Sequence, residues 1–262
     1  MQKHAQLPIL IFLHGLLGTR SDWQQTINLL PNHLCLSLDL PLHGKNKSYV
    51  VQDFEQTCAF LSERIYQHIG NRPYYLIGYS LGGRIALYYA LHAQVAKGNL
   101  CGLILEGANL GLKTELERQV RWRNDLYWAQ RFQRETPQRV LNDWYQQAVF
   151  ADLNPQQRAD LIVKRSEHCG ENIAKMLLAT SLAKQPNFAL QLQQAMLPIH
   201  YIVGERDQKF RKIAQENGLN FSVIVDAGHN AHLENPYQVA EVIKKVVYKE
   251  CVLNRGCFYH RI

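Results

Sequence analysis

The chain has 262 residues, of which 47% are hydrophobic and 19% are charged. This composition excludes a disordered or collagen-like polymer, and the length is enough for a sizeable globular core. No apolar run approaches the roughly 18 residues that cross a bilayer. The first such run, Leu7–Leu13, ends in His14-Gly15 rather than in a small-residue cleavage site. We therefore expect an unprocessed, cytoplasmic protein without membrane insertion.

The formal net charge of +7 allows an anionic ligand, nucleic acid or an acidic surface as a partner. Lys and Arg are dispersed, and their densest segment, 118–134, contains acidic residues as well. Nucleic-acid binders usually carry a basic run or an aromatic–basic module. The charge therefore favours a small anionic ligand over nucleic acid. The six cysteines lack metal-ligand spacing, so we expect free thiols and no bound metal.

Short apolar runs alternate with amphipathic segments over residues 1–110. Strands are predicted at 8–13, 34–40, 74–77 and 100–105, and helices at 54–69 and 84–91. Strands that alternate with helices of this length indicate βαβ units and a mainly parallel sheet. Residues 1–110 are therefore predicted to form the first part of an α/β core.

The alternation stops after this part of the chain. Residues 111–195 are polar and rich in Gln and Arg, and their pattern is helical, with breaks near Pro137, Pro155 and Gly170. This segment is predicted to be a helical cap inserted into the core.

Strand patterns return at 199–203 and 221–225, and a last helix is predicted over 236–248. We expect 196–250 to complete the α/β core. The remaining residues, 251–262, show no clear pattern and are predicted to be a C-terminal tail.

The strongest local signal is Gly78-Tyr-Ser-Leu-Gly-Gly83, a G-x-S-x-G sequence between a predicted strand and a predicted helix. A sharp turn of this kind needs small residues two positions before and after the serine, and it exposes the hydroxyl at the carboxyl end of the sheet. Ser80 is therefore predicted to be the reactive serine. The alternative is a glycine-rich turn with an incidental serine.

A serine hydroxyl needs a base, and the base needs an acid to hold it. Asp207 and His229 each lie four residues beyond a late predicted strand, on the same edge of the sheet as Ser80. Their order after the serine is the order that this fold uses. Three nearby groups are rivals: Glu205, Asp226 and His232. Asp226 is expected to cap the loop, and His232 to order the turn that follows it.

The sequence His14-Gly-Leu-Leu-Gly18 follows the first predicted strand. In such folds an early loop supplies one backbone N–H for an oxyanion, and the residue after the serine supplies the other. Here these would be Leu16 and Leu81. A purely structural turn is the alternative for the early loop.

Together these residues resemble the α/β-hydrolase superfamily over nearly the whole chain. The segment Asp39-Leu-Pro-Leu-His-Gly44 also resembles its D-x-P-G-x-G loop, with Leu42 where glycine is usual. This departure concerns the backbone of the loop and not the triad. The superfamily contains esterases, dehalogenases and lyases, so the fold does not define the reaction.

Arg84 lies one helical turn after Ser80, where a cation opposes the helix dipole at a cost of about 0.3–1 kcal/mol. A carboxylate ligand beside the serine would compensate for this cost. An ordinary surface arginine is the alternative.

A closer resemblance extends to the cap and the late loops. Four segments are similar to the menaquinone-pathway 2-succinyl-6-hydroxy-2,4-cyclohexadiene-1-carboxylate synthase family: Gly78–Arg84, Asn142–Phe150, Gly204–Phe210 and Ala227–Pro236. The resemblance implies elimination of pyruvate from 2-succinyl-5-enolpyruvyl-6-hydroxy-3-cyclohexene-1-carboxylate, without cofactor or metal. The implied partner is therefore a small substrate with several carboxylates.

The resemblance also implies substrate contacts for Arg84 and for five other residues: Arg121, Arg165, Trp144, Tyr145 and Tyr79. Arginine suits a carboxylate because its planar fork binds both oxygens. For the cap residues the alternative is ordinary helix surface or core packing.

Two other classes of function remain. A carboxylesterase or thioesterase for an acidic substrate would use Ser80 as a true nucleophile. A non-catalytic binding module is disfavoured because the triad is intact. We expect a monomer or small homo-oligomer.

Overall fold

The computed structural model describes residues 7–253, with side chains described through residue 249. Six parallel strands form one sheet in the order β2-β1-β3-β4-β5-β6. The strands are β1 (Ile9–Leu13), β2 (Cys35–Leu38), β3 (Tyr74–Tyr79), β4 (Leu100–Glu106), β5 (Ile199–Gly204) and β6 (Phe221–Ile224). The α/β class and all six predicted strands are therefore confirmed.

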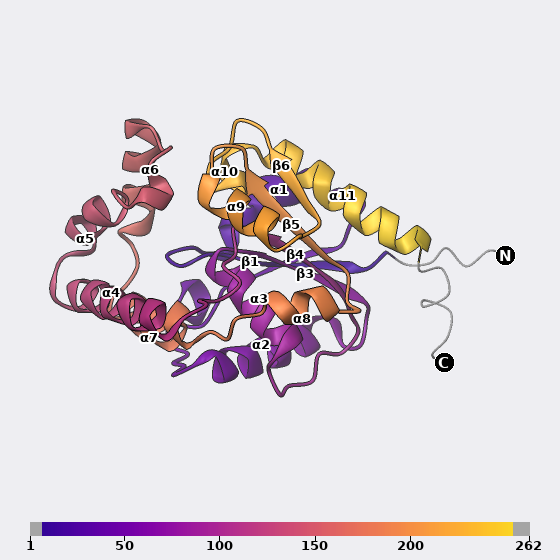
Figure 1. The fold of residues 1–262 in the computed structure, drawn as a ribbon, viewed down its shortest axis with the longest axis horizontal. Helices are drawn as coiled ribbons and strands as arrows, with labels where there is room; N and C mark the ends of the chain where they lie inside the picture. Colours follow the sequence, from indigo (N-terminus) through magenta and orange to yellow (C-terminus); the bar gives the residue numbers. More distant parts are fainter. Residues whose placement is uncertain (1–6, 254–262) are drawn as a thin grey trace.

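Alternate residues of the strands face opposite sides of the sheet, and helices bury both sides. Ile9, Ile11 and Leu13 pack with one set of helices, and Leu10 and Phe12 with the other. The first set is α2 (Phe54–Ile69), α3 (Leu81–Leu91), α8 (Ala189–Gln194) and α9 (Gln208–Glu216), and the second is α1 (Gln24–Asn28), α10 (Ala231–Glu234) and α11 (Pro236–Leu253). Figure 1 shows α2, α3 and α8 below the sheet and α1 and α11 above it.

Between β4 and β5 the described chain contains helices and no strand. The helices before α8 are α4 (Glu115–Arg134), α5 (Pro137–Trp144), α6 (Pro155–Arg165) and α7 (Gly170–Ala179). Proline at the first position starts both α5 and α6, where its missing N–H is not needed. These four helices lie apart from the sheet (Figure 1) and share a hydrophobic cluster that includes Trp128, Phe132 and Leu141.

The two ends of this insertion meet, since the Phe188 N–H donates to the Leu110 carbonyl (2.7 Å). Phe188 is fully buried in the core, and Leu192 of α8 packs against the same layer. We therefore propose that the cap proper consists of α4 to α7, and that the last part of the predicted 111–195 insertion belongs to the core.

The last helix is longer than the sequence pattern predicts, because α11 runs to Leu253 instead of residue 248. Its buried Val239, Ile243 and Val247 lie at helical spacing against the sheet. Residues 251–253, predicted as tail, continue this helix, and residues 254–262 lie outside the described part. None of the helices described is long and apolar enough to span a membrane.

Candidate active site

The turn between β3 and α3 has the geometry that the G-x-S-x-G sequence predicts. Ser80 has φ 49° and ψ −107°, in the left-handed region that non-glycine residues rarely adopt. The chain is packed tightly there, because a Cβ on Gly82 would lie 2.5 Å from the Leu13 carbonyl oxygen. The Ser80 N–H donates to the Glu106 carbonyl (2.8 Å). Packing and this bond hold the strained serine in place.

His229 and Asp207 are paired beside the serine. Nδ1 of His229 lies 2.7 Å from Oδ2 of Asp207, and each side chain is 5% exposed. Because Nδ1–H donates to the carboxylate, Nε2 carries the lone pair of a base. Asp207 also accepts the N–H of Phe210 (3.3 Å), whose ring stacks on the imidazole at 4.7 Å. Both members of the pair are thus held in one orientation.

A cavity of about 290 Å³ lies between the core and the cap. Seven of the residues singled out in the sequence line it: Leu16, Ser80, Leu81, Arg84, Arg121, Trp144 and His229. Within the described residues the Ser80 hydroxyl has no hydrogen-bond partner, so it is available to a ligand in this cavity.

The three rivals for the triad bond elsewhere. The Asp226 N–H donates to the Glu205 carboxylate (3.2 Å), and Asp226 has φ 55° in a tight turn. The imidazole of His232 bonds Glu106 (2.8 Å). The carboxylate that pairs with His229 is therefore Asp207.

Leu16 of the early loop and Leu81 of α3 are the residues predicted to supply an oxyanion hole. Leu16 and Leu81 line the cavity, and in the described structure neither backbone N–H has an acceptor. Leu81 opens α3, where the helix dipole favours negative charge. His14 fixes the loop, since Nε2 accepts the Leu40 N–H (3.0 Å) and Nδ1–H donates to the Gly15 carbonyl (2.7 Å). Burial lowers the pKa of His14 to about 4, so its ring is neutral near pH 7.

Leu42, the departure from the usual glycine, lies in the next loop. Its φ is 64°, so it adopts the left-handed conformation that favours glycine. The neighbouring His43 accepts the Leu17 N–H through Nε2 (3.3 Å). The loop that contains Leu42 therefore contacts the early loop, residues 14–18, although it has leucine in place of the usual glycine.

Arg84 is a buried cation that is held by neutral hydrogen-bond partners. It is 8% exposed and donates to the Thr180 carbonyl (3.0 Å) and to the Gln185 side chain (3.5 Å). No carboxylate of the described chain forms an ion pair with it. Burial lowers the pKa of Arg84 to about 9, with nearby Arg121 acting in the same direction and Asp125 in the opposite one. A charge in this position is costly unless an anion binds beside it, so the cavity is suited to a carboxylate ligand.

Arg121 and Trp144 form the cap side of the cavity. Arg121 donates from Nε to Asp125 (2.8 Å) and remains 31% exposed in its side chain. Trp144 packs edge-on against Trp128, with ring centroids 5.0 Å apart. Both residues are therefore placed to contact a ligand above Ser80.

The structure does not place Arg165, Tyr145 or Tyr79 in the cavity wall. Arg165 is bidentate to Asp22 (2.7 and 3.0 Å), and both side chains are buried. Tyr145 is buried against Phe150, and the Tyr79 hydroxyl donates to Asn230. Each side chain is thus engaged inside the protein, and direct contacts of these three residues with substrate stay a prediction.

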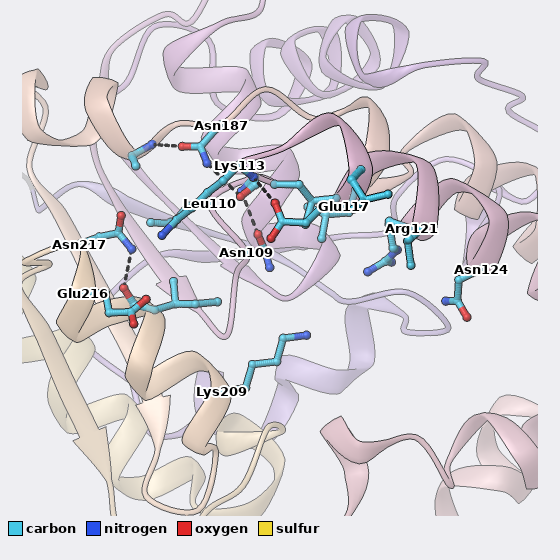
Figure 2. A pocket seen from close by; sticks show the side chains of 17 residues that line it. Asn109, Leu110, Lys113, Glu117, Arg121, Asn124, Asn187, Lys209, Glu216 and Asn217 are labelled. Atoms are coloured by element: carbon cyan, nitrogen blue, oxygen red, sulfur yellow. Dashed lines mark hydrogen bonds between the residues drawn. The ribbon is translucent and has the colours of Figure 1, made fainter.

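Sequence reasoning missed one cation that lines the cavity, Lys209. A second cavity of about 760 Å³ adjoins the first between α4 and α9 (Figure 2). The two cavities share five residues: Asn109, Arg121, Asn124, Leu182 and Lys209. Burial and Arg121 lower the pKa of Lys209, while Asp207 acts in the opposite direction. Its position two residues after Asp207 in a recognised segment was the available signal.

The described side chains include no group of three or more His, Cys, Asp or Glu residues arranged to hold a metal ion. The groups that line the cavity include cations, backbone N–H groups, the Ser80 hydroxyl and the His229 imidazole. This set suits proton transfer beside an anion.

Comparison with known proteins agrees with this geometry. A family model described as alpha/beta hydrolase fold matches residues 8–236. A Yersinia pseudotuberculosis 2-succinyl-6-hydroxy-2,4-cyclohexadiene-1-carboxylate synthase is 46% identical over 234 residues, which cover 89% of this chain and 85% of the relative. A Haemophilus influenzae protein to which the same activity is assigned is 53% identical over 240 residues, 92% of this chain and 97% of the relative.

Among solved structures, MenH from S. aureus superposes with a TM-score of 0.84 and 26% identity, covering 93% of this chain and 94% of that one. An esterase from Thermogutta terrifontis (TM-score 0.76, 22% identity, 93% and 90% coverage) shares the fold. Fold and triad define an enzyme of the α/β-hydrolase class. Within that class, the chain belongs to the 2-succinyl-6-hydroxy-2,4-cyclohexadiene-1-carboxylate synthase family, which confirms the resemblance found in the sequence.

Proposed function

We propose that this chain is the lyase that eliminates pyruvate from 2-succinyl-5-enolpyruvyl-6-hydroxy-3-cyclohexene-1-carboxylate in menaquinone synthesis. The single observation that carries the proposal is the buried Arg84. It lies one helical turn from Ser80, forms no ion pair within the described residues, and lines the same cavity as Ser80 and His229. The names of the relatives support the same reaction. A substrate with several carboxylates supplies the anion that Arg84 lacks.

In this mechanism His229, oriented by Asp207, takes the proton of the Ser80 hydroxyl. The alkoxide removes the ring proton next to the succinyl carbonyl, and the negative charge that develops on the carbonyl oxygen is stabilised by the N–H groups of Leu16 and Leu81. Electrons then shift through the ring and the bond to the enolpyruvyl oxygen breaks. The leaving enolate takes up the proton held by His229, which restores the neutral imidazole, and the enol becomes pyruvate. Ser80 acts as a base, and no acyl-enzyme forms.

Arg84 and Arg121 act by positioning. Each can bind one carboxylate of the substrate. These contacts would hold the reacting proton near Ser80, so that binding energy is used to orient the substrate for the reaction. Lys209 lines the same cavity and the adjoining one, where it adds to the positive potential that a substrate anion meets.

A carboxylesterase or thioesterase acting on an acidic substrate is the second candidate, because the same triad could form an acyl-enzyme. We also propose a cytoplasmic enzyme that acts as a monomer or small homo-oligomer. The free thiols of Cys58 and Cys169 fit a reducing compartment.

The test is pyruvate release from enzymatically generated substrate by wild type and by Ser80→Ala. Ser62→Ala, on α2 and outside the cavity, is the matched control. We expect the wild type to release pyruvate rapidly and to cleave p-nitrophenyl acetate only slowly. Ser80→Ala should nearly abolish pyruvate release, and Ser62→Ala should preserve it. Release no faster than the uncatalysed rate, with good ester turnover, would replace the lyase with the esterase.

A further inference from the structure

Glu106, at the carboxyl end of β4, bonds to both halves of the catalytic machinery. Its backbone carbonyl accepts the Ser80 N–H (2.8 Å). Its carboxylate oxygen Oε1 accepts the backbone N–H of His232 (3.1 Å) and Nδ1–H of the same residue (2.8 Å). His232 lies three residues after His229, so one buried side chain connects the strand beside the serine to the loop of the base.

The imidazole of His232 is fixed on several sides. Trp23 stacks on it with ring centroids 4.2 Å apart and an interplanar angle of 24°, and the Tyr79 ring lies 4.7 Å away. The Trp23 indole is held in turn, since Nε1–H donates to the Leu13 carbonyl (3.2 Å). His232 and Glu106 are each 1% exposed, so the pair cannot rearrange without disturbing the core.

The pair is also costly, which indicates a role other than stability. In the described structure Oε2 of Glu106 and Nε2 of His232 have no hydrogen-bond partner. A buried polar atom without a partner destabilises the folded state, and an apolar pair of the same shape would avoid this cost. Neither residue lines the cavity, so neither touches the substrate.

A second bond runs beside the first. The hydroxyl of Tyr79, the residue before Ser80, donates to the side chain of Asn230, the residue after His229. The segments that flank Ser80 and His229 are therefore connected twice. A small shift of either segment changes the distance that the Ser80 proton must cross, and misplacement by about 1 Å can cost about 100-fold in rate.

We propose that Glu106 and His232 are positioning residues that set the separation between the Ser80 hydroxyl and Nε2 of His229. The inference rests on the Ser80–His229 proton transfer of the proposed function, and it does not depend on which substrate enters the cavity. Its mechanism is the hydrogen bond at Oε1, so a side chain that keeps an acceptor there preserves the effect.

The experiment compares Glu106→Ala and His232→Ala with the conservative variants Glu106→Gln and His232→Asn. The glutamine keeps a carbonyl oxygen for His232, and the asparagine amide can donate where Nδ1–H does. Tyr74→Phe is the matched control, since it removes a buried hydrogen bond to Tyr89 (3.0 Å) at the opposite end of β3. The readouts are kcat, KM, the low-field NMR resonance of the His229–Asp207 proton and the rate at which a fluorophosphonate labels Ser80.

We expect each alanine variant to lower kcat by about 10- to 100-fold with KM nearly unchanged. The low-field resonance should broaden or shift, and the labelling rate should fall. Both conservative variants should recover most of kcat, and the double alanine variant should be no slower than either single one. Alanine variants that match Tyr74→Phe in all readouts, or that change KM alone, would overturn the proposal.

The two proposals fail separately. If wild type releases no pyruvate, the lyase assignment fails, while the NMR resonance and the labelling rate still report the Ser80–His229 geometry in every variant. If wild type releases pyruvate and the alanine variants retain kcat, the positioning role fails and the lyase stands.

Discussion

The core and the cap contribute to one cavity by different means. The core supplies Ser80, Asp207 and His229 from strand ends, where backbone packing and hydrogen bonds fix each side chain. The cap supplies Arg121 and Trp144 from helices with a separate hydrophobic cluster. The chemistry is thus built on the rigid sheet, whereas the proposed recognition of the substrate uses both units, because the core also supplies Arg84.

Two buried arginines, Arg84 and Arg165, make the difference concrete. Arg84 belongs to the core, lines the cavity and has no carboxylate partner in the described chain. Arg165 belongs to the cap and is bidentate to Asp22, which also binds Lys164 (2.8 Å). The first arginine is available to a substrate, while the second joins α6 to the segment that follows the oxyanion loop.

Asp207→Asn tests the core side and carries the largest expected effect. Asparagine can hold the imidazole in the wrong tautomer, so kcat should fall on the order of 10³-fold with a smaller change in KM. Steady-state pyruvate release measures it, and Glu205→Gln, which removes the neighbouring charge, is the control. If Glu205→Gln is as slow as Asp207→Asn, the acid of the triad has been misassigned.

Arg84→Met tests recognition by an unpaired cation. A charge-assisted hydrogen bond is worth about 1.5–3 kcal/mol, so kcat/KM should fall about 10- to 100-fold. Stability should change little, because the variant removes a buried charge that forms no ion pair within the described residues. Kinetics and urea unfolding of the same preparations measure both effects, with Arg123→Met on the exposed side of α4 as control. Unchanged kcat/KM would show that Arg84 does not bind the substrate.

Arg165→Met should give the opposite result. It leaves Asp22 buried with one remaining cation, so the free energy of unfolding should decrease by about 3 kcal/mol. Asp22→Asn should be destabilising as well, and the double variant Asp22→Asn/Arg165→Met should be more stable than the sum of the single effects predicts. If the free energy of unfolding is normal and KM rises as far as in Arg84→Met, Arg165 contacts the substrate instead of stabilising the fold.

The smallest expected effect is the pH dependence of stability. Burial lowers the pKa of His14 to about 4, whereas an unfolded histidine titrates near 6.5, so the unfolded chain binds more protons between these values. Stability should therefore be complete above pH 6.5 and decrease as the pH falls toward 4, with about 2 kcal/mol lost between pH 7 and pH 5. Burial of His43 acts in the same direction. Urea unfolding at the two pH values measures the change, and a constant midpoint would contradict it.

Much of the core could be predicted because its signals are local. The strands have short apolar runs, α2 was predicted with its observed bounds, and the glycines around Ser80 are required by backbone contacts within a few residues and with β1. The order of Asp207 and His229 after late strands placed both at one edge of the sheet. In contrast, α9 was not predicted, and its polar sequence gives only a short apolar face at Phe210 and Ala214.

By itself the sequence determined the α/β fold, the triad and the family, because these depend on periodicity, on chain order and on motifs that each lie within a few residues. Only the tertiary structure decided that Arg84 and Arg121 face the cavity, that Arg165 faces Asp22 and that Glu106 meets His232. Glu106 and His232 are 126 positions apart in the sequence, and Asp22 and Arg165 are 143 positions apart. The direction of a charged side chain is decided by the partner that packing brings beside it, and no local pattern encodes that partner.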